Sequence, residues 1–188
     1  RYQLATELDL LLTYLSTEEI KTFIVPLAWT LLDDKVTDVR EATISLLSHI
    51  LKRYEASEVE SLFQTLVEKF LQSESWYNRQ IFLYLCLDIL EADSISNDMF
   101  CSKLLPHYLK LASDDPVPNI RIVAARGISR HMLSKESFSS EKNKSLEAIE
   151  EVRLKLKSDH DRDVRQFACT DNELVTEEET KDIDILDF

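Results

Sequence analysis

The chain has 188 residues, 44% of them hydrophobic, and a formal net charge of −13; these values suit one folded domain or a run of small repeats, not a disordered chain. The negative charge disfavours nucleic acid and anionic membrane surfaces as partners, and no apolar run approaches the ~20 residues of a membrane helix. A single glycine excludes glycine-rich phosphate loops and predicts helices joined by polar turns.

Helical stretches are predicted in pairs, with a short polar loop inside each pair. The first helix of each pair is expected at residues 18–32, 58–71, 98–112 and 142–156. Pro26 and Pro106 fall inside two of these stretches. We expect them to bend the helices, because proline removes a backbone hydrogen bond and clashes with the preceding turn.

The second helix of each pair repeats apolar residues at helical spacing. The predicted inward stripes are Val39, Ala42, Leu46, Leu47, Ile50, Leu51 and Tyr54; Ile81, Phe82, Leu85, Cys86, Ile89 and Leu90; and Ile120, Val123, Ala124, Ile128 and Met132. The last helix is expected to be short, since Asp171 and Asn172 stand where earlier repeats have large apolar residues. With partial elements at both ends, nine helical stretches are expected.

An arginine recurs every ~40 residues, at the start of each second helix, and this period is typical of two-helix solenoid repeats. These arginines are Arg1, Arg40, Arg79, Arg121 and Arg165. Six residues before the last four stand Asp34, Ser73, Asp115 and Asp159. We expect a structural ladder, in which an arginine such as Arg40 pairs with Asp34 or Asp115 and ties one repeat to the next. The alternative is that the guanidinium groups are presented to carboxylates of a partner.

The pattern predicts an all-α, right-handed superhelix of antiparallel helix pairs over residues 1–169. It would comprise a partial first repeat, three full repeats and a shortened last one, each covering the apolar stripe of its neighbour. Residues 170–188 are expected to form an acidic, disordered tail. Alternatively, the alternation of acids with Ile, Leu and Phe at 183–188 is a docking motif, and Thr176 is a phosphorylation site.

The loop and helix sequences resemble those of a known family. They are PLAW at 26–29, VREAT at 39–43, WYNRQ at 76–80, LPHYLKLA at 105–112, DPVPNIR at 115–121 and DRDVRQFA at 161–168. Together they resemble the last HEAT repeats of the scaffold subunit of protein phosphatase 2A and, more closely, the HEAT-repeat regulatory subunits of protein phosphatase 4.

The resemblance implies a non-catalytic scaffold that holds the protein phosphatase 4 catalytic subunit along its loops and directs it to phosphoprotein substrates or adaptors. It also implies no cofactor of its own and a location in the cytoplasm that can extend to the nucleus. The alternative is a HEAT-repeat adaptor for an unrelated cargo such as a transport factor, since a fold does not fix a function. An enzyme is the third interpretation, with no nucleophile elbow to support it.

The loops inside the helix pairs are the predicted protein-binding sites. The candidate residues are Lys35, Thr37, Trp76, Tyr77, Pro116 and Val117. Aromatic side chains often anchor interfaces, and prolines stiffen a loop so that binding orders it at lower cost. Alternatively, Trp76 packs back on the start of its own helix, and the prolines only make the turn.

Histidine and cysteine residues do not predict a metal site. The four histidines are His49, His107, His131 and His160, and the three cysteines are Cys86, Cys101 and Cys169. None stands three or four residues from another in the spacing of metal ligands. The odd number of cysteines, without a CxxC motif, suits a reducing compartment.

Overall fold

The computed structural model describes residues 1–133 and 144–169, and the regular structure in these ranges is helical. The chain forms two compact units, unit 1 (residues 1–105) and unit 2 (residues 106–188). The sequence predicted one continuous run of repeats over residues 1–169. The division between the units falls inside the predicted helix at 98–112, beside a break in that helix at Leu104. The predicted tail and Thr176 lie outside the described residues.

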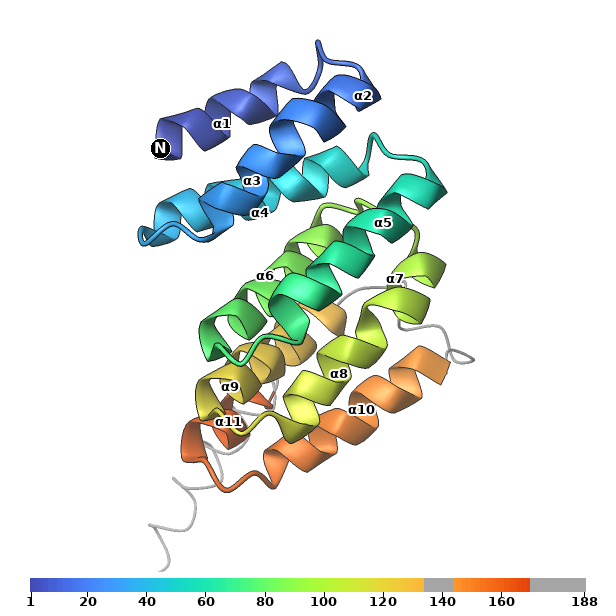
Figure 1. Ribbon diagram of the computed structural model, residues 1–188. Helices are drawn as coiled ribbons and strands as arrows, with labels where there is room; N and C mark the ends of the chain where they lie inside the picture. Colours follow the sequence, from blue (N-terminus) through green and yellow to red (C-terminus); the bar gives the residue numbers. More distant parts are fainter. Residues whose placement is uncertain (134–143, 170–188) are drawn as a thin grey trace, which may run out of the picture. The chain divides into compact units, whose positions relative to one another are not determined.

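Unit 1 starts with α1 (Tyr2–Leu11) and continues with two helix pairs (Figure 1). In each pair, helix A precedes the loop and helix B follows it. The first helix A is built from α2 (Thr17–Glu19), a π-helical turn (Ile20–Ile24) and α3 (Val25–Leu32), and its helix B is α4 (Thr37–Leu51). The second pair comprises α5 (Ala56–Leu66) with a π-helical turn (Val67–Leu71), then α6 (Trp76–Glu91); α7 (Asn97–Lys103) follows.

Unit 2 repeats the same arrangement of helices A and B. Its elements are α8 (Leu105–Asp114), α9 (Pro118–Gly127) with a π-helical turn (Ile128–Met132), α10 (Lys144–Lys157) and the short α11 (Arg162–Phe167). If a stretch interrupted only by a π-helical turn or a single residue is counted once, residues 1–133 and 144–169 hold nine helical stretches. The prediction of an all-helical array of pairs is therefore confirmed.

The two prolines inside predicted helices stand at helix starts. Pro26 lies in the first turn of α3, directly after the π-helical turn, and Pro106 is the second residue of α8. The regular helix is interrupted at Leu104, whose φ of −107° departs from the usual helical value while its backbone stays in the right-handed helical region. Pro106 follows the interruption, where its missing N–H would have no partner. Pro26 lies inside a continuous helix A, where the missing N–H accompanies the π-helical turn before it. The expected bend is therefore a change of helix type before Pro26 and an interruption before Pro106.

Polar side chains fix where several helices begin. The Ser16 hydroxyl accepts from the Glu19 N–H, while the Glu19 carboxylate accepts from the Ser16 N–H, which is a capping box. The Ser96 hydroxyl accepts from the Met99 N–H at the start of α7. The Asp161 carboxylate accepts from the N–H groups of Asp163 and Val164 at the start of α11. Each cap satisfies backbone donors that have no partner inside the helix.

The core of unit 1 lies around α4, which contacts α1, α3 and α6. The predicted stripes are confirmed except for Ala42 and Tyr54, which are half-buried. Thr43, Ile44 and Leu83 are also buried, although they were not among the predicted stripe residues. Thr43 stands four residues from both Val39 and Leu47 and so lies within the α4 stripe. A helix B packs against helices on several sides, so it buries more than one face.

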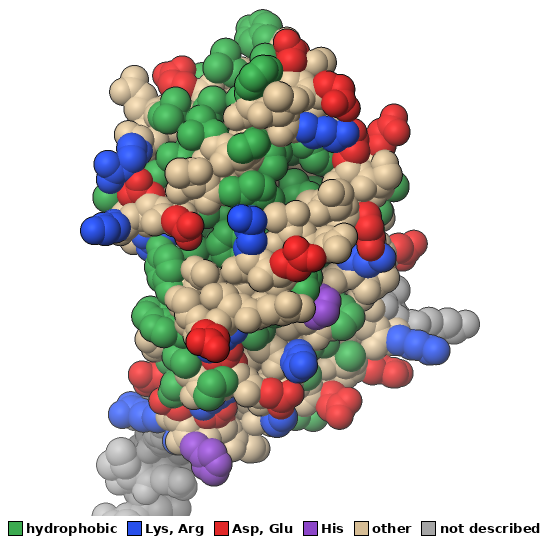
Figure 2. All heavy atoms as spheres, in the orientation of Figure 1, with side chains coloured by type: hydrophobic (Ala, Val, Ile, Leu, Met, Phe, Trp, Pro, Cys, Tyr) green, Lys and Arg blue, Asp and Glu red, His purple; other side chains and the backbone are tan. Residues whose placement is uncertain are grey.

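Large hydrophobic side chains stay exposed on and near α1. They are Tyr2, Leu4, Leu10, Leu11 and Tyr14. On the face drawn in Figure 2, hydrophobic side chains gather over the α1–α3 part of unit 1. In unit 1, acidic and basic side chains stand among them on this face.

Candidate protein-binding site

The loops inside the helix pairs gather at one end of the helices in each unit, which we call the loop edge. In unit 1 it comprises residues 33–37 and 72–77, and in unit 2 residues 115–117 and 158–161 (Figure 1). All six predicted binding residues lie on these two loop edges. Their arrangement depends on the arginine that follows each loop.

Each of these four arginines donates a hydrogen bond to the backbone carbonyl of the residue six positions earlier. The pairs are Arg40 with Asp34 at 2.9 Å, Arg79 with Ser73 at 3.0 Å, Arg121 with Asp115 at 2.7 Å, and Arg165 with Asp159 at 2.7 Å. The guanidinium thus closes its own loop, because a charged donor to a carbonyl is a strong hydrogen bond.

The side chain of the same residue turns the loop at its start. The carboxylates of Asp34, Asp115 and Asp159 each accept from the N–H two residues later at 2.9 Å, and the Ser73 hydroxyl does so at 3.2 Å. This is the local turn that aspartate and serine favour. One residue therefore supplies both the turn and the acceptor for the arginine, which explains the recurring six-residue spacing.

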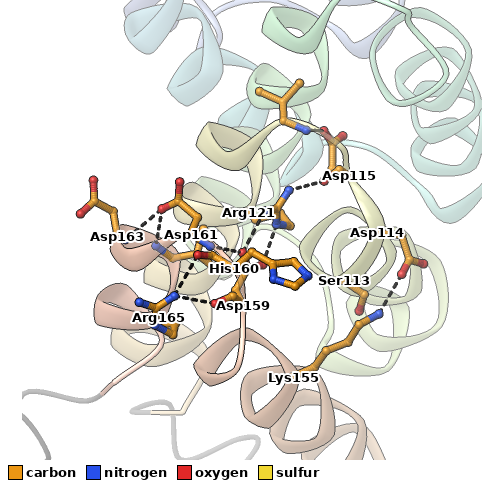
Figure 3. A network of polar contacts seen from close by, with 12 residues as sticks. Ser113, Asp114, Asp115, Arg121, Lys155, Asp159, His160, Asp161, Asp163 and Arg165 are labelled. Carbon is orange, nitrogen blue, oxygen red and sulfur yellow. Dashed lines mark hydrogen bonds and ion pairs between the residues drawn. The ribbon is translucent and has the colours of Figure 1, made fainter.

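Two carboxylates of the ladder also receive an arginine from the preceding repeat. In unit 2, Arg121 binds both carboxylate oxygens of Asp159, with Nε at 2.7 Å and Nη2 at 2.9 Å (Figure 3). In unit 1, Arg1 pairs with Asp34 in the same way. These fork-shaped contacts join one loop to the next.

The Arg121–Asp159 pair is largely shielded from water, because its side chains are only 14% and 12% exposed. The Arg121 guanidinium, by its hydrogen bonds, holds the pKa of the Asp159 carboxyl below its usual value, although burial opposes this. The hydrogen bond from Arg1 likewise lowers the pKa of Asp34. Both carboxylates are therefore charged acceptors at neutral pH.

Arg40 does not bind a carboxylate in the next loop as Arg121 does, because that loop has no aspartate at the corresponding position. Serine occupies that position, as Ser73, and Arg40 instead lies over the ring of Tyr77, 4.6 Å from the centroid. The Tyr77 hydroxyl donates to the backbone carbonyl of Asp34 at 3.4 Å, and burial raises its pKa. The contact of Arg40 with Asp34 uses the Asp34 backbone carbonyl, within one loop, because the Asp34 carboxylate binds Arg1.

The candidate binding residues differ in solvent exposure and in their contacts within the chain. Lys35, Thr37 and Pro116 are exposed, and Trp76 is 45% exposed at the first position of α6. Val117 is half-buried, and its N–H is held by Asp115. Tyr77 is occupied within unit 1, so its ring supports the loop edge, and its role in binding a partner stays a prediction. In the sequence, this role was indicated by Ser73, which stands where the other loops have an aspartate and so leaves Arg40 to contact Tyr77.

Other polar clusters do not suggest chemistry. Nδ1 of His49 lies 2.7 Å from an Asp9 oxygen, which joins α4 to α1. No group of three or more His, Cys, Asp or Glu among the described residues could hold a metal ion. Cys86 is buried, which raises the pKa of its thiol, while Cys101 and Cys169 are half-buried and unpaired by disulfides. No helix in residues 1–133 or 144–169 is long and apolar enough to cross a membrane.

Comparison with known proteins places the repeats in a wider group. The HEAT repeat family matches residues 24–54, which cover the second half of helix A and all of helix B of the first pair. The chain is 34% identical over 172 residues to serine/threonine-protein phosphatase 4 regulatory subunit 1 of Homo sapiens, and equally to that of Mus musculus. The match covers 89% of this chain and 18% of each relative, so the chain spans less than a fifth of their length. It is thus an all-α chain of HEAT-repeat type, similar in sequence to part of protein phosphatase 4 regulatory subunit 1.

Proposed function

We propose that this chain is part of a non-catalytic regulatory subunit of a protein phosphatase 4-type complex. The observation that supports it most is the 34% identity to proteins named as regulatory subunits, over 89% of the chain. On this proposal the catalytic subunit is the main partner, and phosphoprotein substrates or adaptors bind the assembled complex. The chain would act in the cytoplasm and also in the nucleus, without binding nucleic acid or membrane.

The loop edge is the surface we assign to the catalytic subunit. Its loops are held by an arginine to the carbonyl of Asp34 or its counterpart, so little flexibility would be lost on binding. Exposed Lys35 and Trp76 lie on two successive loops of unit 1, which Tyr77 joins through Asp34. A rigid partner could therefore contact both loops together.

Replacing Trp76 by alanine should weaken binding of the purified phosphatase 4 catalytic subunit by at least about tenfold, which corresponds to ~1.4 kcal/mol. The reason is that a large ring, exposed on a fixed loop edge, is the type of side chain that anchors interfaces. Affinity would be measured by biolayer interferometry with the tagged full chain immobilised.

The matched control is Tyr84→Ala, which removes another exposed aromatic ring from the same helix α6. Tyr84 lies eight residues further along, about 12 Å from the start of the helix, and its loss should change the affinity less than twofold. Deleting residues 173–188 should also leave binding nearly intact. The proposal is wrong if the unchanged chain shows no affinity for the catalytic subunit, or if Tyr84→Ala weakens binding more than Trp76→Ala.

The alternative function, an adaptor for a transport factor, predicts a different partner. Affinity capture from a cell extract, followed by mass spectrometry, would then return transport factors and no metal-dependent phosphatase. Phosphatase activity in the highly purified chain would instead show that the chain is itself an enzyme. We infer that it is not, because its relatives are named regulatory subunits.

A further inference from the structure

A groove of about 610 Å³ runs between α1 and α4, on the helices of unit 1. Its apolar lining is Tyr2, Leu10 and Ala42, and its polar lining is Thr6, Asp9, Asp38, Glu41 and Ser45. Tyr2 is 54% and Leu10 64% exposed. The groove therefore offers apolar area to an incoming chain as well as polar groups.

The charges in this groove have one sign. Asp9 on α1 and Asp38 and Glu41 on α4 are its charged lining residues, and no lysine or arginine lines it. Asp9 pairs with His49, whereas Asp38 and Glu41 form no ion pair within the described residues. The negative charge of Asp38, in the first turn of α4, stabilises the N-terminus of that helix through the helix dipole. Glu41 has no such role and faces solvent in the groove.

The spacing of these carboxylates favours several separate cations over one metal ion. No group of three or more ligand side chains in the described part of the chain could hold a metal ion. Lysine or arginine side chains, by contrast, can reach Asp38 and Glu41 individually and lay their methylene stems on Leu10. The exposed ring of Tyr2 can also receive a cation on its face.

We propose that the groove between α1 and α4 binds an extended lysine- or arginine-rich segment of a partner protein. This inference is independent of the proposed function, because it requires no phosphatase. Acidic side chains attract such a segment, and the apolar lining adds contact area that a simple counter-ion would not use.

The test uses the full chain and a short fluorescein-labelled peptide of alternating lysine and leucine, with binding followed by fluorescence anisotropy at low salt. The double change Asp38→Asn and Glu41→Gln should weaken binding roughly fivefold, since each exposed charge contributes modestly. Leu10→Ser should weaken it as well. Added salt should reduce the difference between the variants, because exposed charges are screened.

The matched control is Glu147→Gln with Glu151→Gln on α10, which removes the same net charge from exposed side chains elsewhere. It should change the affinity less than twofold, and melting curves would confirm that each variant folds. Equal weakening by both double variants would mean attraction by net charge only and would overturn the proposal. So would unchanged binding in the groove variant, or sedimentation showing a dimer of the chain that the groove variant dissociates.

Discussion

Replacing Leu47 by alanine should lower the free energy of unfolding by about 2–5 kcal/mol, as large-to-small changes in cores do. Leu47 is fully buried in α4, which contacts α1, α3 and α6. The lost methyl groups would therefore leave a cavity in the packed core around α4. Urea unfolding followed by circular dichroism measures the change.

Trp76→Ala is the comparison for this experiment, because Trp76 has a larger side chain but is 45% exposed. Its loss should cost less stability than the loss of Leu47. The opposite ranking would mean that Trp76 is a core residue, and it would then be removed from the candidate binding surface. The same purified variants serve the affinity measurements.

Replacing Asp159 by asparagine should lower the stability of the chain by about 2 kcal/mol at neutral pH, because the Arg121 guanidinium loses a charged acceptor in a shielded place. The pair is bidentate, with N–O distances of 2.7 and 2.9 Å. The loss should appear in the unfolding of unit 2, which contains both residues. Urea unfolding at several pH values is the measurement.

The direction of the pH dependence follows from the lowered pKa of Asp159. A carboxyl with a lower pKa in the folded state contributes its full stability above the pKa of the unfolded state, near 4. That contribution is lost as the pH falls through the folded-state pKa. The natural chain should therefore lose stability below about pH 4 more steeply than Asp159→Asn does.

Asp114→Asn is the control for this pair. Asp114 lies 2.9 Å from Lys155, but both side chains are about 60% exposed, so the change should cost only a few tenths of a kcal/mol. If Asp114→Asn and Asp159→Asn cost the same at neutral pH, the shielded pair has no special role in joining the loops. An identical acid dependence in the natural chain and Asp159→Asn would contradict the pKa argument.

The helices were predictable because each carries an apolar stripe with a clear period, and the arginines gave the repeat. What the period could not give was the number of neighbours around each helix. Ile44 and Leu83 are buried because α4 and α6 pack on several sides. The helix break at Leu104 was missed because Pro106 was interpreted as lying inside a helix, when it lies in the first turn of the next one.

The loop edge was located from the sequence, but its internal contacts were not. The spacing between Asp34 and Arg40 indicated an interaction, yet a sequence does not show that the acceptor is a backbone carbonyl. Tyr77 was assigned to a partner because aromatic residues are common at interfaces, and this assignment stays a prediction. The sequence did not show that its hydroxyl binds Asp34 and that its ring lies against Arg40. The groove between α1 and α4 was also missed, because its lining comes from two repeats.

Crosslinking mass spectrometry on the native complex would test most directly whether the loop edge holds the phosphatase catalytic subunit. Lys35 lies on the loop edge just before α4, while Lys52 follows the other end of this 15-residue helix, about 22 Å away. We predict crosslinks from Lys35 to a metal-dependent phosphatase catalytic subunit, and none or few from Lys52. Crosslinks to that subunit from Lys52 but not from Lys35, or crosslinks only to transport factors, would contradict this assignment.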